Sequence, residues 1–161
     1  MVKAEGDAAC GDIGMAELTE TKSDLRICCA GELVPVRQTL QHVRHFLSAQ
    51  DIPYEVSADI DLVLSEIMTN IVEHGYKDAA GVIECDLVLN TASVECRMSD
   101  TGRAFDPSGA GHTAPDPATF AEGGYGWFLV RSLTSQLSYA REGDRNILHF
   151  SMQRRAADEP C

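Results

Sequence analysis

The sequence has no long apolar run and few positive charges. No stretch approaches the roughly 20 apolar residues that a membrane-spanning helix needs, and the N-terminus contains no apolar segment typical of a signal peptide. These absences predict a cytoplasmic protein without a membrane anchor. Thirteen Lys and Arg stand against 25 Asp and Glu, which leaves a net charge of −12. Because this excess of negative charge repels a phosphate backbone, we expect no direct nucleic-acid binding.

Cysteines at metal-binding spacing are also missing. The six cysteines form no CxxC pattern and have no histidine at zinc-ligand spacing. Cys85 and Cys96 fall on two runs typical of a hairpin, where a two-residue turn at Thr91-Ala92 would make them diagonal neighbours. Diagonal neighbours lie about 7–8 Å apart, which is too far for an easy disulfide. We therefore expect reduced and mostly buried thiols.

The length and the hydrophobic content predict one domain. A chain of 161 residues with 44% hydrophobic residues suits a single compact fold. Residues 1–23 are polar and acidic without periodicity, so we expect a flexible N-terminal extension there, and a flexible tail over 154–161. The whole fold then lies within residues 24–153.

Periodicity within this domain predicts both helices and strands. In chain order, we expect a strand at 25–30, helices at 36–50 and 55–75, strands near 84–87 and 94–98, a helix at 126–137, and strands at 138–141 and 147–152. Residues 103–123 are rich in Gly, Ala, Pro, Asp and Thr and show no periodicity, which is typical of a functional lid. This order predicts an α+β two-layer sandwich, with helices on one face of a mixed, mostly antiparallel sheet.

Three clusters of residues stand out within this pattern. In the first, Glu66, Asn70 and Glu73 share one helix face because they lie at i, i+4 and i+7. The second, residues 100–106, follows a strand. The third, residues 123–126, is rich in glycine and opens a helix, where backbone amides can face an anion. Taken singly, the clusters are also typical of a solvated helix face, a turn and a loop–helix junction.

Taken together, the clusters resemble the N, G1 and G2 boxes of the GHKL ATPase and kinase superfamily. The run LSEIMTNIVEHGY at 64–76 resembles the SExxxNxxxHGY pattern of the anti-sigma factor serine/threonine kinases. The run GGYGWFLVRSL at 123–133 resembles the box that follows the lid in that family. The resemblance covers residues 24–153 and implies the Bergerat ATP-binding fold of histidine-kinase-like ATPase domains.

The resemblance also implies a site for ATP and Mg²⁺. Asn70 would coordinate Mg²⁺ through its side-chain oxygen, and Glu66 would be the general base that accepts a proton from the attacking hydroxyl. Asp100 would accept a hydrogen bond from the adenine amino group, and Gly102 would let the base approach the backbone. The remaining nucleotide-binding residues would be Glu73, His74, Arg103, Phe105, Gly123, Gly124, Tyr125 and Gly126, with residues 103–123 as the ATP lid.

The chain departs from the family pattern at three positions. Ala104 stands where the G1 box usually has a second glycine. No Lys or Arg occurs between Phe105 and Gly123, so Arg103 is the nearest cation in the sequence. Asn146 lies near the place where the last hairpin usually carries threonine, and could replace its hydrogen bond. A P-loop sequence GxxxxGK[ST] is absent, and the resemblance requires none.

The function implied by the resemblance is that of an ATP-dependent serine/threonine protein kinase acting as an anti-sigma factor. It would bind a sigma factor and phosphorylate a STAS-domain anti-anti-sigma protein. The relatives dimerise through the first strand and helix, which would place Arg37 and Arg44 at a homodimer interface. Glu66 favours the enzyme, because a pure binding protein needs no base beside Asn70. The cation-poor lid favours the alternative, a nucleotide-gated partner-binding module with little or no kinase activity.

Overall fold

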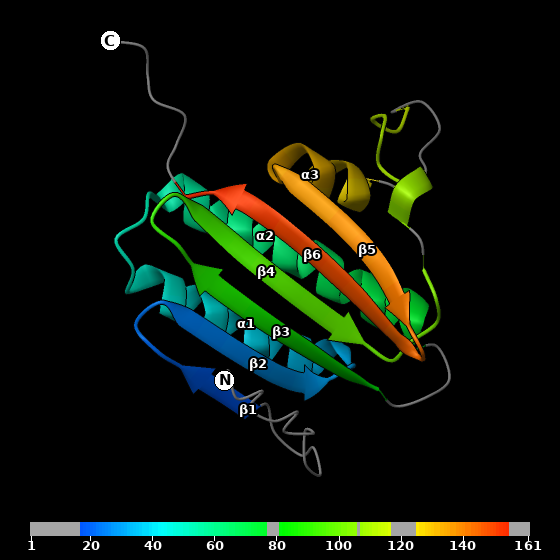
Figure 1. Cartoon of the computed structure of the whole chain (residues 1–161), viewed down its shortest axis with the longest axis horizontal. Helices are drawn as coiled ribbons and strands as arrows, with labels where there is room; N and C mark the ends of the chain where they lie inside the picture. The colour runs from blue at the N-terminus through cyan, green and yellow to red at the C-terminus, as the bar shows by residue number, and fades with distance from the viewer. Residues whose placement is uncertain (1–16, 77–80, 106, 117–124, 155–161) are drawn as a thin grey trace, which may run out of the picture.

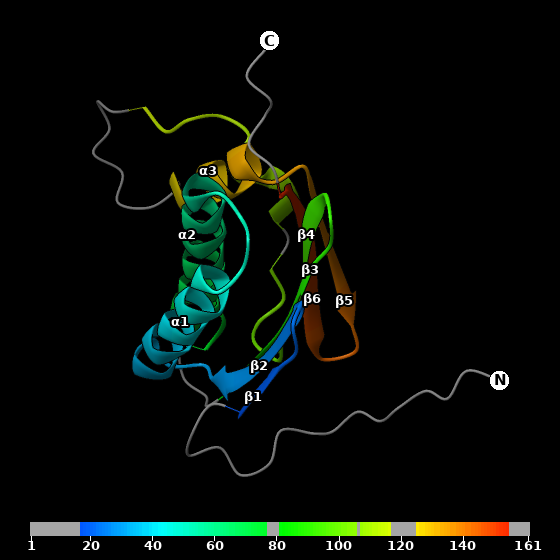
Figure 2. The same cartoon turned by 90° about the vertical axis from the view of Figure 1, so that its left-hand side faces the viewer.

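The fold is an antiparallel sheet with helices packed against one face (Figures 1 and 2). The computed structural model describes residues 17–76, 81–105, 107–116 and 125–154. Within these ranges the strands pair in the order β1-β2-β3-β4-β6-β5. The strands are β1 (Glu17–Glu20), β2 (Asp24–Ala30), β3 (Val82–Leu89), β4 (Ser93–Asp100), β5 (Gln136–Glu142) and β6 (Arg145–Gln153). The helices are α1 (Leu33–Ser48), α2 (Tyr54–Asn70) and α3 (Tyr125–Leu133), with a π-helical turn at Ile71–Gly75 and a 3-10 turn at Pro107–Gly109.

The hydrophobic core lies between the sheet and the helices. Along β3, half-buried and buried residues alternate over the whole strand, because successive side chains point to opposite faces of a sheet. Helices α1 and α2 each turn one apolar stripe toward the same face of the sheet. Buried side chains include Val36, Leu40 and Val43 from α1, Ile60, Val63 and Ile67 from α2, and Ile83, Cys85 and Leu87 from β3. The apolar layer ends at the last residues of β4, where buried polar side chains begin.

The α+β two-layer architecture expected from the sequence is therefore confirmed. The described strands pair only in antiparallel fashion, so the expected mixed sheet is corrected to an antiparallel one. Helix α3 ends at Leu133 and not at Leu137, because residues from Gln136 onward pair with β6. None of the helices in the described ranges is long and apolar enough to cross a bilayer.

The N-terminal region contains a strand that the sequence did not predict. Residues 17–20 form β1 and pair with β2 from Glu17↔Cys28 to Glu20↔Leu25, so this part of the expected flexible extension is ordered. Its four residues are too few and too polar to show a strand period. Residues 1–16 of the expected extension and 155–161 of the expected tail lie outside the described residues.

The cysteines follow the sequence prediction in part. The backbone N–H of Asn90 donates to the Ser93 carbonyl at 2.9 Å and closes the expected two-residue turn. Cys85 and Cys96 are diagonal neighbours, with their sulfur atoms 3.5 Å apart on the buried face of the sheet. Both are free, as is the buried Cys29. Cys28 is disulfide-bonded, which corrects the expectation of a reduced thiol at that position.

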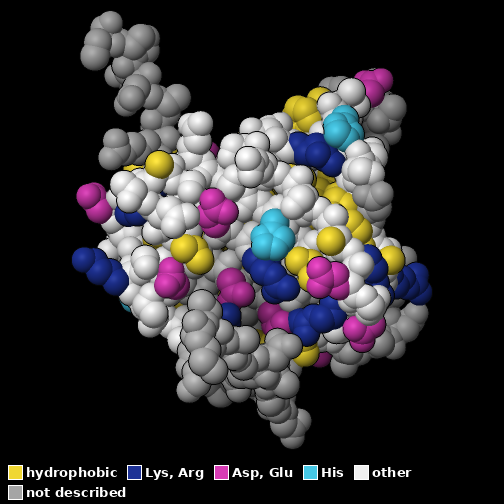
Figure 3. All heavy atoms as spheres, in the orientation of Figure 1, with side chains coloured by type: hydrophobic (Ala, Val, Ile, Leu, Met, Phe, Trp, Pro, Cys, Tyr) yellow, Lys and Arg dark blue, Asp and Glu magenta, His cyan; other side chains and the backbone are white. Residues whose placement is uncertain are grey.

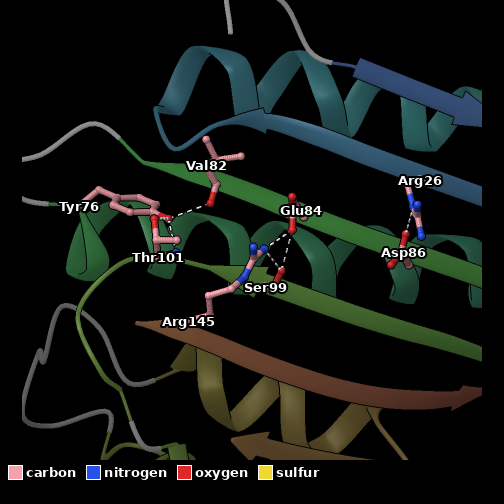
Figure 4. A network of polar contacts seen from close by, with 8 residues as sticks. All are labelled: Arg26, Tyr76, Val82, Glu84, Asp86, Ser99, Thr101 and Arg145. Atoms are coloured by element: carbon pink, nitrogen blue, oxygen red, sulfur yellow. Dashed lines mark hydrogen bonds and ion pairs between the residues drawn. The ribbon is translucent and has the colours of Figure 1, made fainter. Parts of the chain in front are cut away.

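The face of the sheet opposite the helices is charged. Arg26 pairs with Asp86 at 2.6 Å, and Arg145 donates to the Glu84 carboxylate and, at 2.9 Å, to the Ser99 hydroxyl (Figure 4). Basic and acidic side chains are interspersed over the part of this face that Figure 3 shows. Exposed ion pairs contribute only about 0–1 kcal/mol each, so this face adds little to stability.

Tyr76 ties the π-helical turn to the sheet (Figure 4). Its hydroxyl donates to the Val82 carbonyl and accepts from the Thr101 backbone N–H, each at 2.8 Å. A Cβ atom added at Gly31 or Gly81 would overlap the Tyr76 ring, so only glycine fits beside it. Burial raises the pKa of the Tyr76 hydroxyl above its ordinary value. This packing fixes the C-terminal end of the π-helical turn against the end of β4.

Candidate functional site

A pocket opens where the end of α2, the end of β4 and the start of α3 meet. Most of its wall is apolar, with a few polar side chains directed to the same space, which suits a ligand that has an apolar body and a polar edge. Residues of the first two clusters expected from the sequence line this pocket, and Gly126 of the third cluster lies close to Asn70 at its edge. The pocket is lined by Ile67, Asn70, Ile71, His74, Gly75, Asp100, Arg103, Phe105, Trp127, Tyr139, Asn146 and Leu148.

Asp100 is a buried carboxylate at the end of β4, only 6% exposed. Its Oδ1 accepts from the Gly102 backbone N–H at 2.8 Å and from Asn146 Nδ2 at 2.9 Å. Burial raises the pKa of this carboxyl above its ordinary value, although the bonds from Asn146 and Gly102 oppose that rise. Both of these bonds use Oδ1, so Oδ2 is the oxygen that Asp100 can offer to a ligand in the described part of the site.

Asn146 holds Asp100 in place. Besides its bond to Asp100, Asn146 Nδ2 donates to the Arg103 carbonyl at 2.8 Å. Its Oδ1 accepts from the Tyr139 hydroxyl at 2.7 Å and from Arg141 Nη1 at 2.8 Å. The sequence predicted a hydrogen-bonding role for Asn146. It gave no sign of Tyr139 and Arg141, which reach this point only because β5 pairs with β6.

Gly102 lets the chain after β4 lie directly on the π-helical turn. A Cβ atom at Gly102 would stand 2.9 Å from both Asp100 Oδ1 and Gly75 Cα, which is closer than real Cβ contacts allow. The Arg103 backbone N–H donates to the Gly75 carbonyl at 3.3 Å across the same contact. Single π-helical turns are frequent at functional sites, and this one brings the end of α2 to the rim of the pocket.

Glu66 and Asn70 face the first turn of α3. A Cβ atom at Gly126 would lie 2.5 Å from Glu66 Oε2 and 3.6 Å from Asn70 Nδ2, so these three residues lie close together with no room for a larger side chain at position 126. Asn70 Nδ2 is buried and has no hydrogen-bond partner. Because buried polar groups are nearly always hydrogen-bonded, this N–H donor indicates a missing acceptor, such as an oxygen of a ligand. The proximity of Glu66 and Asn70 agrees with the sequence prediction.

The other expected site residues divide into three groups. His74, Arg103 and Phe105 line the pocket, whereas the exposed Glu73 does not. Tyr125 lies at the start of α3, where its hydroxyl donates to the Pro115 carbonyl at 3.2 Å. Gly123 and Gly124 lie outside the described residues, as does part of the expected lid.

An aromatic pair forms one side of the pocket. The rings of Phe105 and Trp127 stack with centroids 5.3 Å apart and planes inclined by 23°. Trp127 also packs against the core, which is the role that its place on an apolar helix predicts. Its position in the pocket wall was missed, because the stacking depends on residue 105, which is distant in the sequence.

Replacement of Gly126 by alanine tests the contact between α3 and Glu66. The new methyl group would displace the Glu66 carboxylate, since that carboxylate is the flexible end of the contact. We expect Gly126→Ala to fold with an unfolding free energy within about 1 kcal/mol of the wild type, because exposed or movable contacts cost little. Nucleotide affinity or turnover should fall about tenfold or more. Calorimetric titration with nucleotide and thermal unfolding measure the two effects.

Thr91→Ala, in the exposed turn between β3 and β4, is the control, because that turn lies outside the pocket and the lid. This variant should match the wild type in both measurements. Nucleotide binding and turnover in Gly126→Ala equal to those of Thr91→Ala would contradict the functional importance of the contact between α3 and Glu66.

The antiparallel sheet with helices on one face, and the pocket beside α2 and α3, are consistent with one family of ATPase domains. Residues 29–152 match the family model described as histidine kinase-like ATPase domain, and the chain belongs to that family. Membership in a family of ATPase domains implies that the chain binds ATP.

Several curated relatives carry the name serine-protein kinase RsbW. The protein from Oceanobacillus iheyensis is 31% identical over 87 residues, which cover 50% of this chain and 55% of the relative. The protein from Listeria monocytogenes is 31% identical over 98 residues, covering 56% of this chain and 62% of the relative. The protein from Staphylococcus epidermidis is 28% identical over 133 residues, covering 77% and 82%. The chain thus spans less than two thirds of the first two relatives.

Proposed function

We propose that this chain is an ATP-dependent serine/threonine protein kinase that acts as an anti-sigma factor. The observation that carries the proposal is the meeting of Glu66, Asn70 and Gly126 beside a pocket that Asn70 lines and that also holds the buried Asp100. A general base next to a pocket with an adenine acceptor suits a phosphotransferase. The names of the RsbW relatives support the protein-serine specificity.

The adenine base would bind at the Asp100 end of the pocket. Asp100 Oδ2 would accept a hydrogen bond from the adenine 6-amino group, since Oδ1 is already bonded to Gly102 and Asn146. Apolar residues of α2, the π-helical turn and β6, among them Ile67, Ile71 and Leu148, would contact the faces of the ring. Because Asn146 and its neighbours hold Asp100 rigidly, little conformational entropy would be lost when the base binds.

The residues at the other end of the pocket fit Mg²⁺. Asn70 lines the pocket and offers a side-chain oxygen, which is a hard ligand for a hard ion, whereas its buried, unpartnered Nδ2 can only donate to an acceptor such as a phosphate oxygen. No cluster of three His, Cys, Asp or Glu that could hold a metal ion occurs in the described residues. Mg²⁺ commonly takes one or two protein oxygens and completes its shell with phosphate oxygens and water, so Asn70 suffices as the protein ligand. When bound, the ion would neutralise negative charge on the phosphates.

Glu66 would act as the general base. A serine hydroxyl of the partner would attack the γ-phosphorus, forming a new P–O bond while the bond from that phosphorus to the β–γ bridging oxygen breaks. Glu66 would take the hydroxyl proton, and ADP would leave. The backbone amides in the first turn of α3 would face the phosphates, with the positive end of the helix dipole toward them.

The partners follow from the family resemblance. We propose a sigma factor as the sequestered partner, a STAS-domain anti-anti-sigma protein as the phosphate acceptor, and a homodimer as the functional unit. Arg37 and Arg44 are exposed on α1, where they are accessible to a second protein; Arg44 pairs with Asp61 at 2.9 Å.

The test is incubation of the chain with γ-labelled ATP, Mg²⁺ and the STAS protein encoded nearest to its gene. The proposal expects the label on a serine or threonine of that protein and none when Mg²⁺ is chelated. ATP binding without any transfer of label would favour the alternative, a nucleotide-gated binding module, for which the cation-poor lid is the supporting observation.

Replacement of Asp100 by asparagine separates adenine recognition from stability. The Asn Oδ1 can accept the bonds from Gly102 and Asn146, but its Nδ2 would meet the adenine amino group donor to donor. We expect ATP affinity to fall about 10- to 100-fold, as for a lost hydrogen bond with an unpaired buried donor. Calorimetric titration with ATP measures this loss, and unchanged affinity would contradict the adenine contact.

The same variant should be at least as stable as the wild type at pH 7. The pKa of Asp100 is raised in the folded state, so folding of the wild type carries a penalty while the carboxylate is charged. That penalty is relieved as the pH falls through the folded pKa toward the unfolded value near 3.8. The stability difference between variant and wild type should therefore shrink with falling pH in urea unfolding. A difference that grows as the pH falls would contradict the raised pKa.

A further inference from the structure

The described part of the lid is attached to α3. Arg131, in the second turn of α3, donates through Nε to the Ala110 carbonyl at 2.5 Å and through Nη2 to the Pro107 carbonyl. Both acceptors belong to the 3-10 turn and the residue that follows it. The guanidinium is half-buried, and charge-assisted hydrogen bonds of this kind are stronger than neutral ones. A single side chain of α3 therefore holds the turn at both of its ends.

Gly111 gives a second contact between the same two elements. Its φ of +74° lies in the left-handed region that favours glycine, and a Cβ atom there would overlap the Trp127 carbonyl and the Phe128 nitrogen. The backbone of the lid thus touches the backbone of the first turn of α3. Tyr125, which donates to the Pro115 carbonyl, extends the attachment to the start of the helix.

These contacts continue into the pocket. Trp127, whose backbone contacts Gly111, stacks its ring on Phe105 in the pocket wall. The neighbouring Gly126 faces Glu66 and Asn70. The Phe105 backbone N–H donates to the Tyr139 hydroxyl at 3.1 Å, so this wall is also joined to the residues that hold Asp100. A shift of the lid against α3 would move the residues that face the phosphates.

We infer that Arg131 is a positioning residue that locks the lid segment 107–111 onto α3 and thereby sets the first turn of α3 against Glu66 and Asn70. Arg131 lines no part of the adenine pocket, so it acts through Gly111, Trp127 and Gly126 and not by touching the base. The inference rests on the proposed function, in which that first turn faces the phosphates. The lid has no Lys or Arg after Arg103. In this inference Arg131 of α3 provides a positive charge that binds the lid from outside.

The test compares Arg131→Met and Arg131→Lys with the wild type. Methionine keeps much of the aliphatic bulk but makes neither hydrogen bond, so we expect about a tenfold faster release and weaker binding of Mg·ATP. Lysine is a point charge that cannot reproduce the planar fork, so it should restore only part of the affinity. Stopped-flow displacement of a fluorescent ATP analogue measures release, and titration calorimetry measures affinity. Arg97→Met, the same change on the exposed outer face of the sheet, is the control and should leave both values unchanged.

The fluorescence emission of Trp127 is a second measurement. It would not change if Arg131 only stabilised the fold. Trp127 is the only tryptophan of the chain and belongs to the attached region, so its emission should shift in folded Arg131→Met. Gly111→Ala should shift the emission in the same way, and the double variant should release nucleotide no faster than the worse single variant, because both act on one contact. An Arg131→Met protein with lower thermal stability but unchanged nucleotide release and unchanged emission would overturn the inference.

Failure of the proposed function gives a different result. A wild-type chain that binds no ATP would refute the proposed function, whereas the emission of Trp127 in Arg131→Met and Gly111→Ala would still decide whether Arg131 positions α3. An unchanged emission in both variants would overturn the inference whatever the wild type binds.

Discussion

Asn70→Ala is expected to lower Mg²⁺-dependent ATP affinity about a hundredfold or more. Asn70 provides the side-chain oxygen proposed as the ligand of Mg²⁺. Among the described side chains that face Gly126, only the Glu66 carboxylate could replace this oxygen, and Glu66 is proposed as the general base. A hundredfold loss corresponds to about 2.7 kcal/mol, which matches the loss of one ligand in a charged site. Titration calorimetry with ATP in the presence of Mg²⁺, and again with EDTA, measures the loss. The difference between the two conditions should disappear in the variant.

The effect should not arise from unfolding. Asn70 Nδ2 has no partner in the fold, so its removal breaks no hydrogen bond of the described structure. A buried polar group without a partner costs free energy, and replacement by alanine should leave the unfolding free energy within about 1 kcal/mol of the wild type. Asn90→Ala, in the exposed β3–β4 turn, is the matched control. Wild-type affinity in Asn70→Ala would count against the entire site assignment.

Glu66→Ala is expected to bind ATP and to transfer almost no phosphate. Loss of a general base lowers the rate of such reactions by about 10²–10⁴-fold. The affinity for ATP should stay within about threefold, because Glu66 is not proposed to contact the adenine ring or the metal ion. Label transfer to the STAS protein under saturating ATP measures the rate, and calorimetry measures the affinity. This variant therefore separates turnover from binding, which Asn70→Ala cannot do.

Glu55→Ala is the control for Glu66→Ala. Glu55 is an exposed acid in the first turn of the same helix and lies outside the pocket. It should transfer phosphate at the wild-type rate. If Glu66→Ala transferred phosphate as fast as the Glu55 variant, the base would have to be sought elsewhere in the pocket.

The sequence predicted those features that depend on local spacing. Glu66 and Asn70 are one helical turn apart, so their shared face follows from helix geometry alone. The strands β3 and β4 were predicted from the alternation over residues 84–87 and 94–98, and their turn from the two-residue loop at Thr91-Ala92. The family resemblance rests on the same short motifs. It is the resemblance that led us to expect the three clusters of residues at one site.

The features that sequence reasoning missed depend on residues distant in the chain. Asn146 meets Asp100 across 46 residues, and Arg131 reaches Ala110 across 21. No sequence periodicity relates such pairs. The first contact depends on the register between β4 and β6, and the second depends on how α3 packs against the core. Strand β1 was missed for a different reason, because four polar residues gain their structure from pairing with β2 and not from their own pattern.

The packing of Tyr76 against Gly31 and Gly81 also limits which substitutions this part of the sequence can accept. The ring fills the space that side chains at Gly31 and Gly81 would need, and its hydroxyl joins Val82 to Thr101. A larger residue at either glycine is therefore compatible only with a smaller one at position 76, which would release both hydrogen bonds. The three positions act as one unit in any redesign, and a change at these positions would loosen the end of the helix that carries Asn70.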